Sequence, residues 1–227
     1  AFRGAGPRFP GALAGVQAAF APIIDRFAMD AQIRDSAQKP RFVIAVSQGS
    51  HCLNDLLHRW STGNLAIDIV AVVSNHEHQR RLSEWHGVPF GHLPVSDASR
   101  AEQESRILDL MARSGADYLV LARYMQVLSQ DLSTRLAGRC INIHHSFLPG
   151  FKGAKPYHRA QERGVKLIGA TAHFVTGDLD EGPIIEQAVE RVDHRDGVDD
   201  LIRIGRDVEA QVLAKAVRWV AEQRVLI

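Results

Sequence analysis

Between residues 41 and 144, runs of consecutive apolar residues alternate with segments in which apolar residues recur every three or four positions. An unbroken apolar run is typical of a parallel strand buried on both faces, and the longer period is that of a helix with one buried face. The pattern predicts strands at 42–46, 67–73, 89–93, 117–122 and 140–144, and helices at 54–60, 79–85, 101–113 and 128–136. This alternation predicts βαβ units, and hence a mostly parallel sheet with helices on both faces.

The pattern changes in the last third of the chain. Apolar-rich segments at 167–175 and 184–192 predict two long strands, joined by the short polar connection 176–183. A short connection joins antiparallel neighbours, whereas a parallel crossover needs about a dozen residues or more, so we expect these strands to pair antiparallel. A long helix over 198–223 closes the chain. The expected fold class is therefore α/β, Rossmann-like, with late antiparallel strands.

The first 40 residues carry a separate pattern. They predict a loop, a helix with apolar residues at helical spacing, a short strand and a linker, at 1–12, 13–27, 31–33 and 36–40. These elements cannot bury themselves alone, so they form either an arm packed on the main domain or the last part of a small domain. The abrupt start at Ala1 and the apolar end at Val225–Ile227 suggest a chain cut at both ends, which favours the second interpretation. We expect domains at 1–38 and 39–227.

Composition places the chain among folded proteins and excludes some partners. Of its 227 residues 45% are hydrophobic, and the formal net charge is +1. A nearly neutral chain has no general attraction for nucleic acid or anionic membranes, and no apolar run approaches the roughly 20 residues of a membrane-spanning helix. Cys52 and Cys140 form no disulfide framework and read as buried thiols in a reducing compartment. We expect a cytoplasmic protein without nucleic-acid or membrane partners.

The first candidate site follows the last parallel strand, because ligands of open α/β sheets bind beyond the carboxyl ends of the strands. Side chains alternate between faces along a strand, so Asn142 and His144 point the same way. A carboxamide beside an imidazole can polarise a carbonyl and transfer a proton. A polar pair that satisfies the backbone at the strand end is the alternative.

A second polar cluster lies in the connection between the late strands. It consists of Asp178, Asp180 and Glu181, followed by Gly and Pro, and such a sequence is often only a tight turn. The turn caps the same sheet, however, and a carboxylate there can face the Asn142–His144 pair. A carboxylate next to an imidazole orients it and can accept a proton from water. Asp180 is the candidate base, and we expect burial to raise its pKa towards neutrality.

The remaining polar clusters of the sequence give weaker evidence of a functional site. Four histidines could suggest a metal site, namely His144, His145, His158 and His173. They form no HExxH motif and lack the compact spacing of metal ligands, so we expect no metal site. Residues 47–51 form neither a dinucleotide fingerprint nor a P-loop, and predict a helix cap or a small anion site. Lys152 and Lys155 could attract a substrate carboxylate or be merely solvated.

At the level of whole motifs, the sequence resembles the formyltetrahydrofolate-utilising family with the formyltransferase fold, and most closely its hydrolytic branch, the deformylases. The resemblance covers Arg41 to the end of the chain almost continuously. The matching segments are INIHHSFLPGFKGAKPYHRA (141–160), GVKLIGATAHFVTGDLDEGPIIEQ (164–187), LARYMQVLS (121–129), SHCLNDLLHRW (50–60) and VVSNHEHQRRLSEWHGVPF (72–90).

The resemblance implies roles for individual residues. The catalytic trio of the family carries over to Asn142, His144 and Asp180. By the same analogy the pterin ring of folate lies between two segments, whose substrate-binding residues are Met125, Gln126, Val127, Leu128, Val175, Thr176, Gly177 and Asp178. Transformylases of the family usually have Met-Arg where this chain has Met125-Gln126.

The resemblance also implies the reaction, which is hydrolysis of 10-formyltetrahydrofolate to formate and tetrahydrofolate without metal or cofactor. The alternative is formyl transfer to an amine such as glycinamide ribonucleotide. Residues 48–53 depart from the Gly/Ser/Asn-rich loop that holds that acceptor in the transformylases, which favours water. Residues 1–38 resemble the last third of an ACT-type regulatory domain, which implies glycine and methionine as effectors. We expect a homo-oligomer that supplies formate to purine synthesis.

Overall fold

The computed structural model describes residues 12–35, 37–96, 98–150 and 156–226. The chain divides into two compact units, Ala1–Lys39 and Pro40–Ile227. Among the described residues, no helix combines the length and the apolarity that crossing a bilayer requires. The two units are therefore described in turn.

In the first unit, helix α1 spans Leu13–Phe27 and ends at Ala28, whose backbone is left-handed. The strand expected at 31–33 is wrong, because these residues belong to neither a strand nor a helix. A strand requires a hydrogen-bonded neighbour, and the described part of this unit contains no second strand. The segment is tied to α1 instead, where the Gln17 side chain donates to the Ile33 carbonyl at 3.1 Å.

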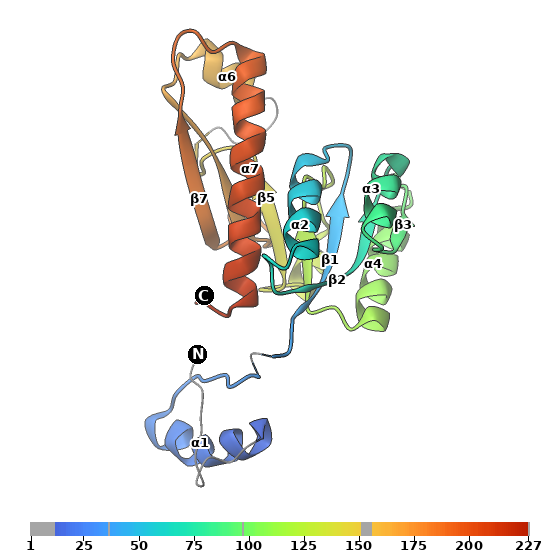
Figure 1. The fold of residues 1–227 in the computed structure, drawn as a ribbon, viewed down its shortest axis with the longest axis vertical. Coiled ribbons are helices and arrows are strands. Elements are labelled where there is room, and N and C mark those ends of the chain that lie inside the picture. The colour runs from blue at the N-terminus through green and yellow to red at the C-terminus, as the bar shows by residue number, and fades with distance from the viewer. Residues whose placement is uncertain (1–11, 36, 97, 151–155, 227) are drawn as a thin grey trace. The chain divides into compact units, whose positions relative to one another are not determined.

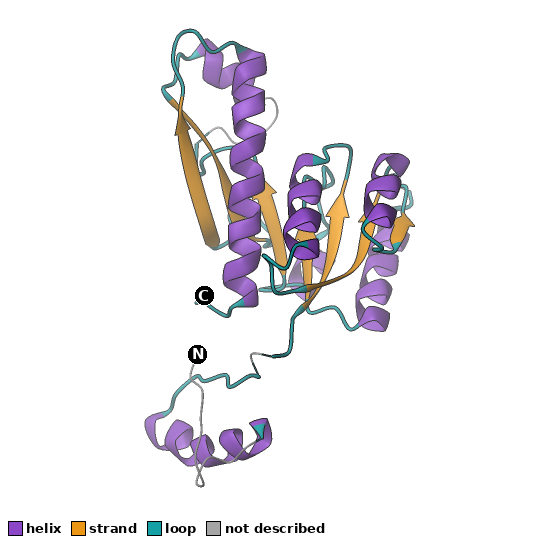
Figure 2. Cartoon of the chain, in the orientation of Figure 1, coloured by secondary structure: helices purple, strands orange, loops and turns teal. Residues whose placement is uncertain are grey.

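The second unit is built on a single sheet in the order β3-β2-β1-β4-β5-β6-β7 (Figures 1 and 2). Neighbours from β3 to β5 pair parallel, and β6 pairs antiparallel with both β5 and β7. The strands are β1 (Arg41–Val46), β2 (Asp68–Ser74), β3 (Phe90–His92), β4 (Tyr118–Leu121), β5 (Cys140–His144), β6 (Leu167–Phe174) and β7 (Ile184–Arg191). This arrangement confirms the expected mostly parallel α/β sheet with late antiparallel strands.

Helices cover both faces of the sheet, and each face has its own core. Residues 42, 44 and 46 of β1 pack with α2 and α7, whereas Val43 and Ala45 pack with α4 and α5 on the other face. This two-sided burial explains why β1 reads as an unbroken apolar run. The helices are α2 (His51–Ser61), α3 (Arg80–Trp85), α4 (Arg100–Ser114), α5 (Gln130–Arg135), α6 (Pro156–Glu162) and α7 (Val198–Ala221), with a 3₁₀ turn at Glu77–Gln79.

Two helices differ from the sequence expectation. Helix α5 begins later than the expected residue 128, because the Ser129 hydroxyl accepts the Leu132 N–H at 3.1 Å and so caps the helix there. Helix α6 was not expected at all. It is short, and of its residues Tyr157 and Ala160 are buried, which is too few to produce a helical period.

Helix α6 contacts α7 where α7 carries a glycine. A Cβ atom on Gly205 would overlap the ring and hydroxyl of Tyr157, so the close approach of the two helices depends on the missing side chain. Tyr157 is the link between this contact and the site described below.

Replacing Gly205 by alanine is expected to lower the free energy of unfolding by about 1–3 kcal/mol, although alanine is the better helix former. The reason is the overlap with Tyr157, which forces α6 away from α7. Urea unfolding of the variant and of Arg203→Ala, an exposed position on the same helix, measures the difference. A variant as stable as the wild type would show that α6 adjusts freely.

Candidate active site

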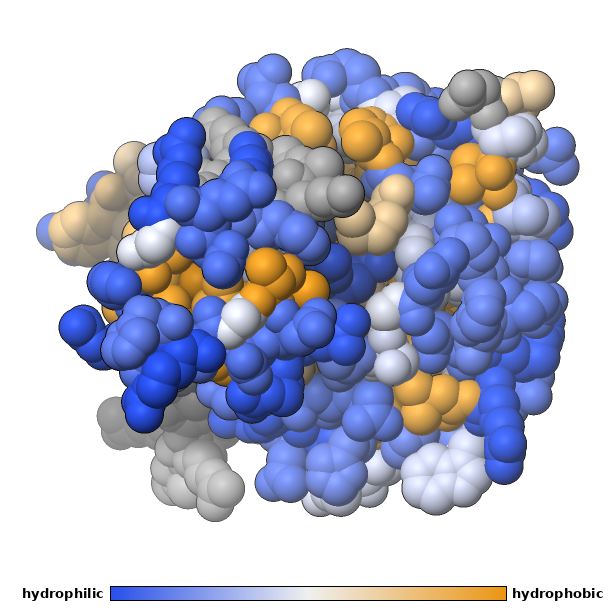
Figure 3. Space-filling view, turned by 90° about the horizontal axis from the view of Figure 1, so that it is seen from above, coloured by the Kyte–Doolittle hydropathy of each residue, from blue (hydrophilic) through white to orange (hydrophobic). Residues whose placement is uncertain are grey.

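The carboxyl ends of the parallel strands border one cavity of about 590 Å³. The arrowheads of β1 and β5 point to the same end of the molecule in Figure 1, and Figure 3 looks onto the molecule from that end. The surface seen there is mostly hydrophilic, with small separate groups of hydrophobic side chains. All of the expected site residues line this cavity, namely Asn142, His144, Asp180, Met125, Gln126, Val127, Leu128, Val175, Thr176, Gly177 and Asp178.

Asn142 is held by a histidine that sequence reasoning had considered only as a metal ligand. In the antiparallel register Asn142 lies opposite His173, and the Asn142 Nδ2 and His173 Nε2 atoms are 3.2 Å apart. The other ring nitrogen, Nδ1, donates to the Phe174 carbonyl at 2.9 Å. Since a carbonyl only accepts, Nδ1 carries the proton, and Nε2 of the neutral ring accepts from the Asn142 amide. His173 therefore fixes the orientation of the carboxamide.

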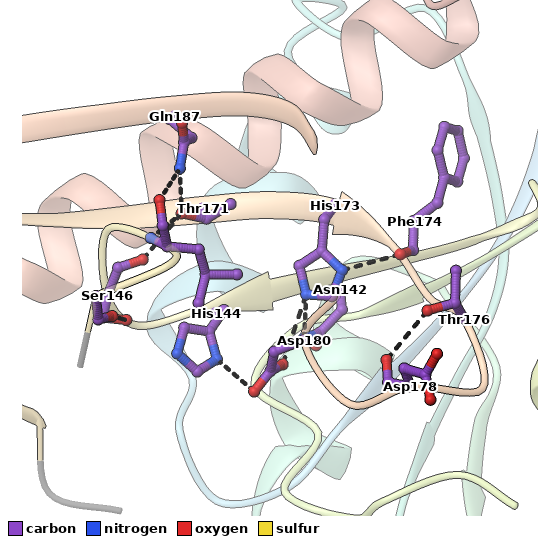
Figure 4. Close-up of polar contacts among 12 residues, drawn as sticks. Asn142, His144, Ser146, Thr171, His173, Phe174, Thr176, Asp178, Asp180 and Gln187 are labelled. Carbon is purple, nitrogen blue, oxygen red and sulfur yellow. Dashed lines mark hydrogen bonds and ion pairs between the residues drawn. The ribbon is translucent and has the colours of Figure 1, made fainter. Parts of the chain in front are cut away.

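His144 and Asp180 form a carboxylate–imidazole pair. His144 Nδ1 lies 3.2 Å from Asp180 Oδ2, and His173 Nε2 lies 3.6 Å from Asp180 Oδ1, so the carboxylate sits between the two rings (Figure 4). The other ring nitrogen, Nε2 of His144, is buried and has no hydrogen-bond partner among the described residues. An unpaired buried nitrogen is costly. The His144 residue itself lines the cavity, so its ring can contact a polar group of a ligand there.

The turn that carries Asp180 has a constrained backbone. Asp180 has φ of 59°, a left-handed conformation that aspartate and asparagine adopt more readily than most residues. Two residues later, a side chain on Gly182 would overlap the Phe174 carbonyl, so the turn must close with glycine. The Leu-Asp-Glu-Gly-Pro sequence is thus a tight turn that also delivers a carboxylate to the site.

The pKa of Asp180 moves in the direction opposite to the expectation. Burial on its own raises this pKa, but the hydrogen bond from His144 Nδ1 outweighs burial and holds the pKa of Asp180 well below its usual range. The expectation of a pKa raised towards neutrality was wrong, because it considered burial and not the hydrogen bond from His144. Asp180 is ionised, and a proton taken from water belongs to the His144–Asp180 pair rather than to the carboxylate alone.

The wall formed by residues 123–129 is fixed by hydrogen bonds to its backbone. The Ser47 hydroxyl donates to Asn75 Oδ1 at 2.7 Å and accepts the Met125 N–H at 3.0 Å. At the other end, the Ser129 N–H donates to Glu104 Oε1 at 2.8 Å. The Ser47 hydroxyl thus connects two loops by hydrogen bonds and does not act as the helix cap that the sequence suggested. Met125 and Val127, both more than half exposed, present their side chains at this wall.

A buried cluster around Glu209 of α7 lines the same cavity and was missed by the sequence analysis. Glu209 is 1% exposed, and its carboxylate accepts from His51 Nε2 at 2.8 Å and from the Tyr157 hydroxyl at 2.7 Å. Arg123 Nε lies 3.3 Å from the same carboxylate. Burial on its own raises the pKa of Glu209, but these three partners lower it, so the group stays ionised. The available signal was a glutamate within the apolar stripe of α7, between Gly205 and Leu213.

The cluster also contains a set of atoms with metal-ligand character. The ligand atoms of His51, Cys52 and Glu209 lie within 4.8 Å of one another. However, Arg123 and Tyr157 already occupy Glu209. Burial and the Glu209 charge raise the pKa of the Cys52 thiol well above its ordinary value, whereas a metal ligand must be a thiolate. The donor set fits an ion network better than a metal centre. Lys152 and Lys155 lie outside the described residues.

His145 joins the two groups. Its ring centroid lies 5.2 Å from that of His144 and 6.2 Å from that of Tyr157. Burial, reinforced by the positive charge of Arg123, lowers the pKa of His145 to about 4. The ring is therefore neutral at neutral pH, and it adds no positive charge beside the His144–Asp180 pair.

The chemistry available to the site follows from these contacts. The Asn142 amide can donate to a carbonyl oxygen in the cavity, the His144 imidazole can transfer a proton there, and the adjacent Asp180 can orient a water molecule and share its proton with His144. Such a set of groups is suited to attack on a carbonyl carbon. The thiol of Cys140 contributes nothing to it, because the side chain is fully buried and burial raises its pKa far above the ordinary value.

Comparison with known proteins identifies the chain's relatives. A sequence profile of the formyl transferase family matches residues 40–217. The chain is 51% identical over 223 residues to the formyltetrahydrofolate deformylase of Corynebacterium sp. (strain P-1), an alignment that covers 98% of this chain and 78% of the relative. The structure of a formyltetrahydrofolate deformylase from Pseudomonas syringae pv. tomato superposes with a TM-score of 0.93 at 52% identity, covering 96% of this chain and 74% of that one.

A more distant solved structure has a different acceptor in its name. Glycinamide ribonucleotide transformylase 1 from Symbiobacterium toebii superposes with a TM-score of 0.78 at 29% identity, covering 88% of this chain and 94% of that one. The fold is therefore common to proteins named for hydrolysis and for transfer.

The pKa of His145 predicts a pH dependence of stability. Between about pH 6.5 and pH 4 the unfolded chain binds a proton at this residue and the folded chain does not, so stability falls as the pH is lowered through this window. His145→Asn is expected to reduce this loss by about 1–3 kcal/mol. Urea unfolding between pH 7 and pH 4 measures it, with His194→Asn as the exposed control. Equal slopes for wild type and His145→Asn would contradict a neutral buried ring.

Proposed function

The chain belongs to the formyl transferase family, and on that premise we propose that it hydrolyses 10-formyltetrahydrofolate to formate and tetrahydrofolate. The observation that supports the reaction type most directly is the His144–Asp180 pair, which lines one cavity together with the Asn142 amide. The identity of about half to proteins named as deformylases supports water as the acceptor.

We propose that folate lies between the two walls of the cavity formed by 125–128 and 175–178. The exposed side chains of Met125 and Val127 offer apolar contacts to the pterin ring, and the fixed backbone of the first wall offers amide groups to its polar edge. The Ser47 and Glu104 hydrogen bonds hold this wall in place before substrate arrives, so less ordering is required on binding. The formyl group then projects to Asn142 and His144.

The proposed chemical step uses the trio in distinct roles. Asn142, oriented by His173, donates an N–H to the formyl oxygen and stabilises the tetrahedral intermediate. Asp180 orients the attacking water, whose proton passes to the His144–Asp180 pair. A new C–O bond forms and the C–N bond to folate breaks, while His144 returns the proton to the departing nitrogen. Formate and tetrahydrofolate result, and no electrons are transferred, so we propose that no redox cofactor or metal takes part.

Several finer features remain proposals that the family resemblance supports. We propose that residues 1–38 are part of an ACT-type domain through which glycine and methionine regulate activity. We also propose that the protein is a cytoplasmic homo-oligomer whose formate supplies purine synthesis. None of these features is needed for the chemistry at the trio.

Formate release with water as the sole acceptor tests the function. The protein is expected to produce formate and tetrahydrofolate in equal amounts from 10-formyltetrahydrofolate, at a rate that added glycinamide ribonucleotide does not change. Formate is measured enzymatically and tetrahydrofolate by absorbance. Formylated glycinamide ribonucleotide as the main product would replace hydrolysis by transfer.

Replacing Asp180 by asparagine is expected to lower kcat by about 10²–10⁴ while KM changes little, because the pair loses its charge but the turn keeps its shape. Formate release gives kcat, and quenching of protein fluorescence gives the affinity for tetrahydrofolate. Glu181→Gln, a change of the neighbouring exposed carboxylate, is the matched control and is expected to stay within a few-fold of wild type. Near-normal turnover of Asp180→Asn would remove Asp180 from the mechanism.

A further inference from the structure

The cavity extends past the catalytic pair into a second compartment. We call it the cationic compartment and define it by His51, Arg123, Tyr157, Arg206 and Glu209, all of which line the same cavity as His144. The neutral ring of His145 lies near both groups, with centroid distances of 5.2 Å to His144 of the catalytic pair and 6.2 Å to Tyr157 of the compartment. Whatever forms at His144 is thus one side chain away from this compartment.

The negative charge in the compartment is already neutralised. The buried Glu209 carboxylate is shared by His51, Tyr157 and Arg123. Arg123 Nε lies 3.3 Å from this carboxylate, and the Arg123 guanidinium donates no hydrogen bond to the side chains or backbone of the described residues. The Arg206 guanidinium, which also lines the cavity, likewise has no partner among the described residues. The compartment therefore holds an excess of positive charge.

The backbone at Arg123 is held in an unusual conformation. Its φ is 62°, in the left-handed region that costs an arginine about 1 kcal/mol or more. The residue persists there because its carbonyl accepts the Ser47 N–H at 3.2 Å and its Nε contacts Glu209. The result is a guanidinium that lines the cavity after β4 and whose N–H groups make no hydrogen bond to the described residues. Strain of this kind is found where a side chain must be placed for a ligand.

A guanidinium with two free terminal nitrogens matches a planar carboxylate, which accepts both N–H groups at once. Hydrolysis of the formyl group would generate such an anion beside His144, while tetrahydrofolate still lies between the walls at 125–128 and 175–178. We propose that the cationic compartment is a formate site, in which Arg123 and Arg206 receive the product carboxylate before tetrahydrofolate leaves. This inference rests on the proposed function, and it adds two residues that the trio does not require.

The site has a consequence for the reaction. Formate that remained at Asn142 and His144 would be positioned to react again with the folate nitrogen, whereas formate bound by Arg123 and Arg206 would be withdrawn from that pair. The positive charge thus favours release in the forward direction without taking part in bond cleavage.

Binding of formate to the full chain saturated with tetrahydrofolate tests the proposal. The titration is followed by line broadening of ¹³C-formate in NMR spectra. Arg206→Gln is expected to weaken formate binding by about tenfold, and Arg123→Gln by about tenfold or more, since each removes a charge-assisted hydrogen bond. Arg203→Gln is the matched control, because Arg203 is on the same helix but pairs with Asp200 at 3.3 Å on the surface.

The variants distinguish the possible failures. Arg123→Gln can unfold the protein by leaving Glu209 with fewer partners, but Arg206 is exposed, so Arg206→Gln keeps the test valid. Unchanged formate affinity in Arg206→Gln and in folded Arg123→Gln would overturn the formate site. Inorganic phosphate that binds more tightly than formate, and depends on both arginines, would assign the compartment to a phosphorylated ligand and also overturn it. A wild-type protein that binds formate but releases none from the substrate would contradict the proposed function alone.

Discussion

The antiparallel pairing of β5 with β6 places the main groups of the candidate site. From β3 to β5 the neighbouring strands of the sheet pair parallel. Because β6 runs back along β5, His173 comes to lie opposite Asn142, and the turn that follows β6 returns Asp180 to the end of β5. If this strand ran parallel to β5, its residues would pair with β5 in a different register, and the turn that follows it would meet β5 in a different place. The orientation of Asn142, the proton on His173 Nδ1 and the lowered pKa of Asp180 all depend on this one pairing.

Helix α7 provides the second constraint, because it joins parts of the cavity that are far apart in the sequence. Its apolar stripe packs against β5 and β6, and Glu209 within that stripe contacts His51 at the start of α2, Arg123 after β4 and Tyr157 of α6. A buried carboxylate requires such partners, since an unpaired charge there would cost several kcal/mol. The Glu209 carboxylate thus fixes where α2, the segment after β4, and α6 meet the cavity.

Much of the fold and part of the site could be predicted from the sequence, for a physical reason in each case. The two-residue period of a strand placed Asn142 and His144 on one face, and turn chemistry located the carboxylate of Asp180. His173 was missed as a partner of Asn142 because strand register depends on contacts between distant residues. The predicted pKa of Asp180 was wrong because the sequence indicated its burial but not the hydrogen bond that His144 donates to it. Glu209 gave a local signal, a charge among apolar positions, but its three partners are 52 to 158 residues away.

The arrangement around Glu209 also limits how the chain can diverge. Its partners on α2, after β4 and on α6 share one carboxylate, so losing any of them leaves part of a buried charge uncompensated, and losing Glu209 leaves its partners without their shared acceptor. A protein in which only one of residues 51, 123, 157 and 209 is replaced is therefore less stable, whereas replacing them together avoids an uncompensated buried charge. These positions are expected to be inherited together. An evolutionary path that reshapes this end of the cavity for another acceptor has to change several of them at nearly the same time.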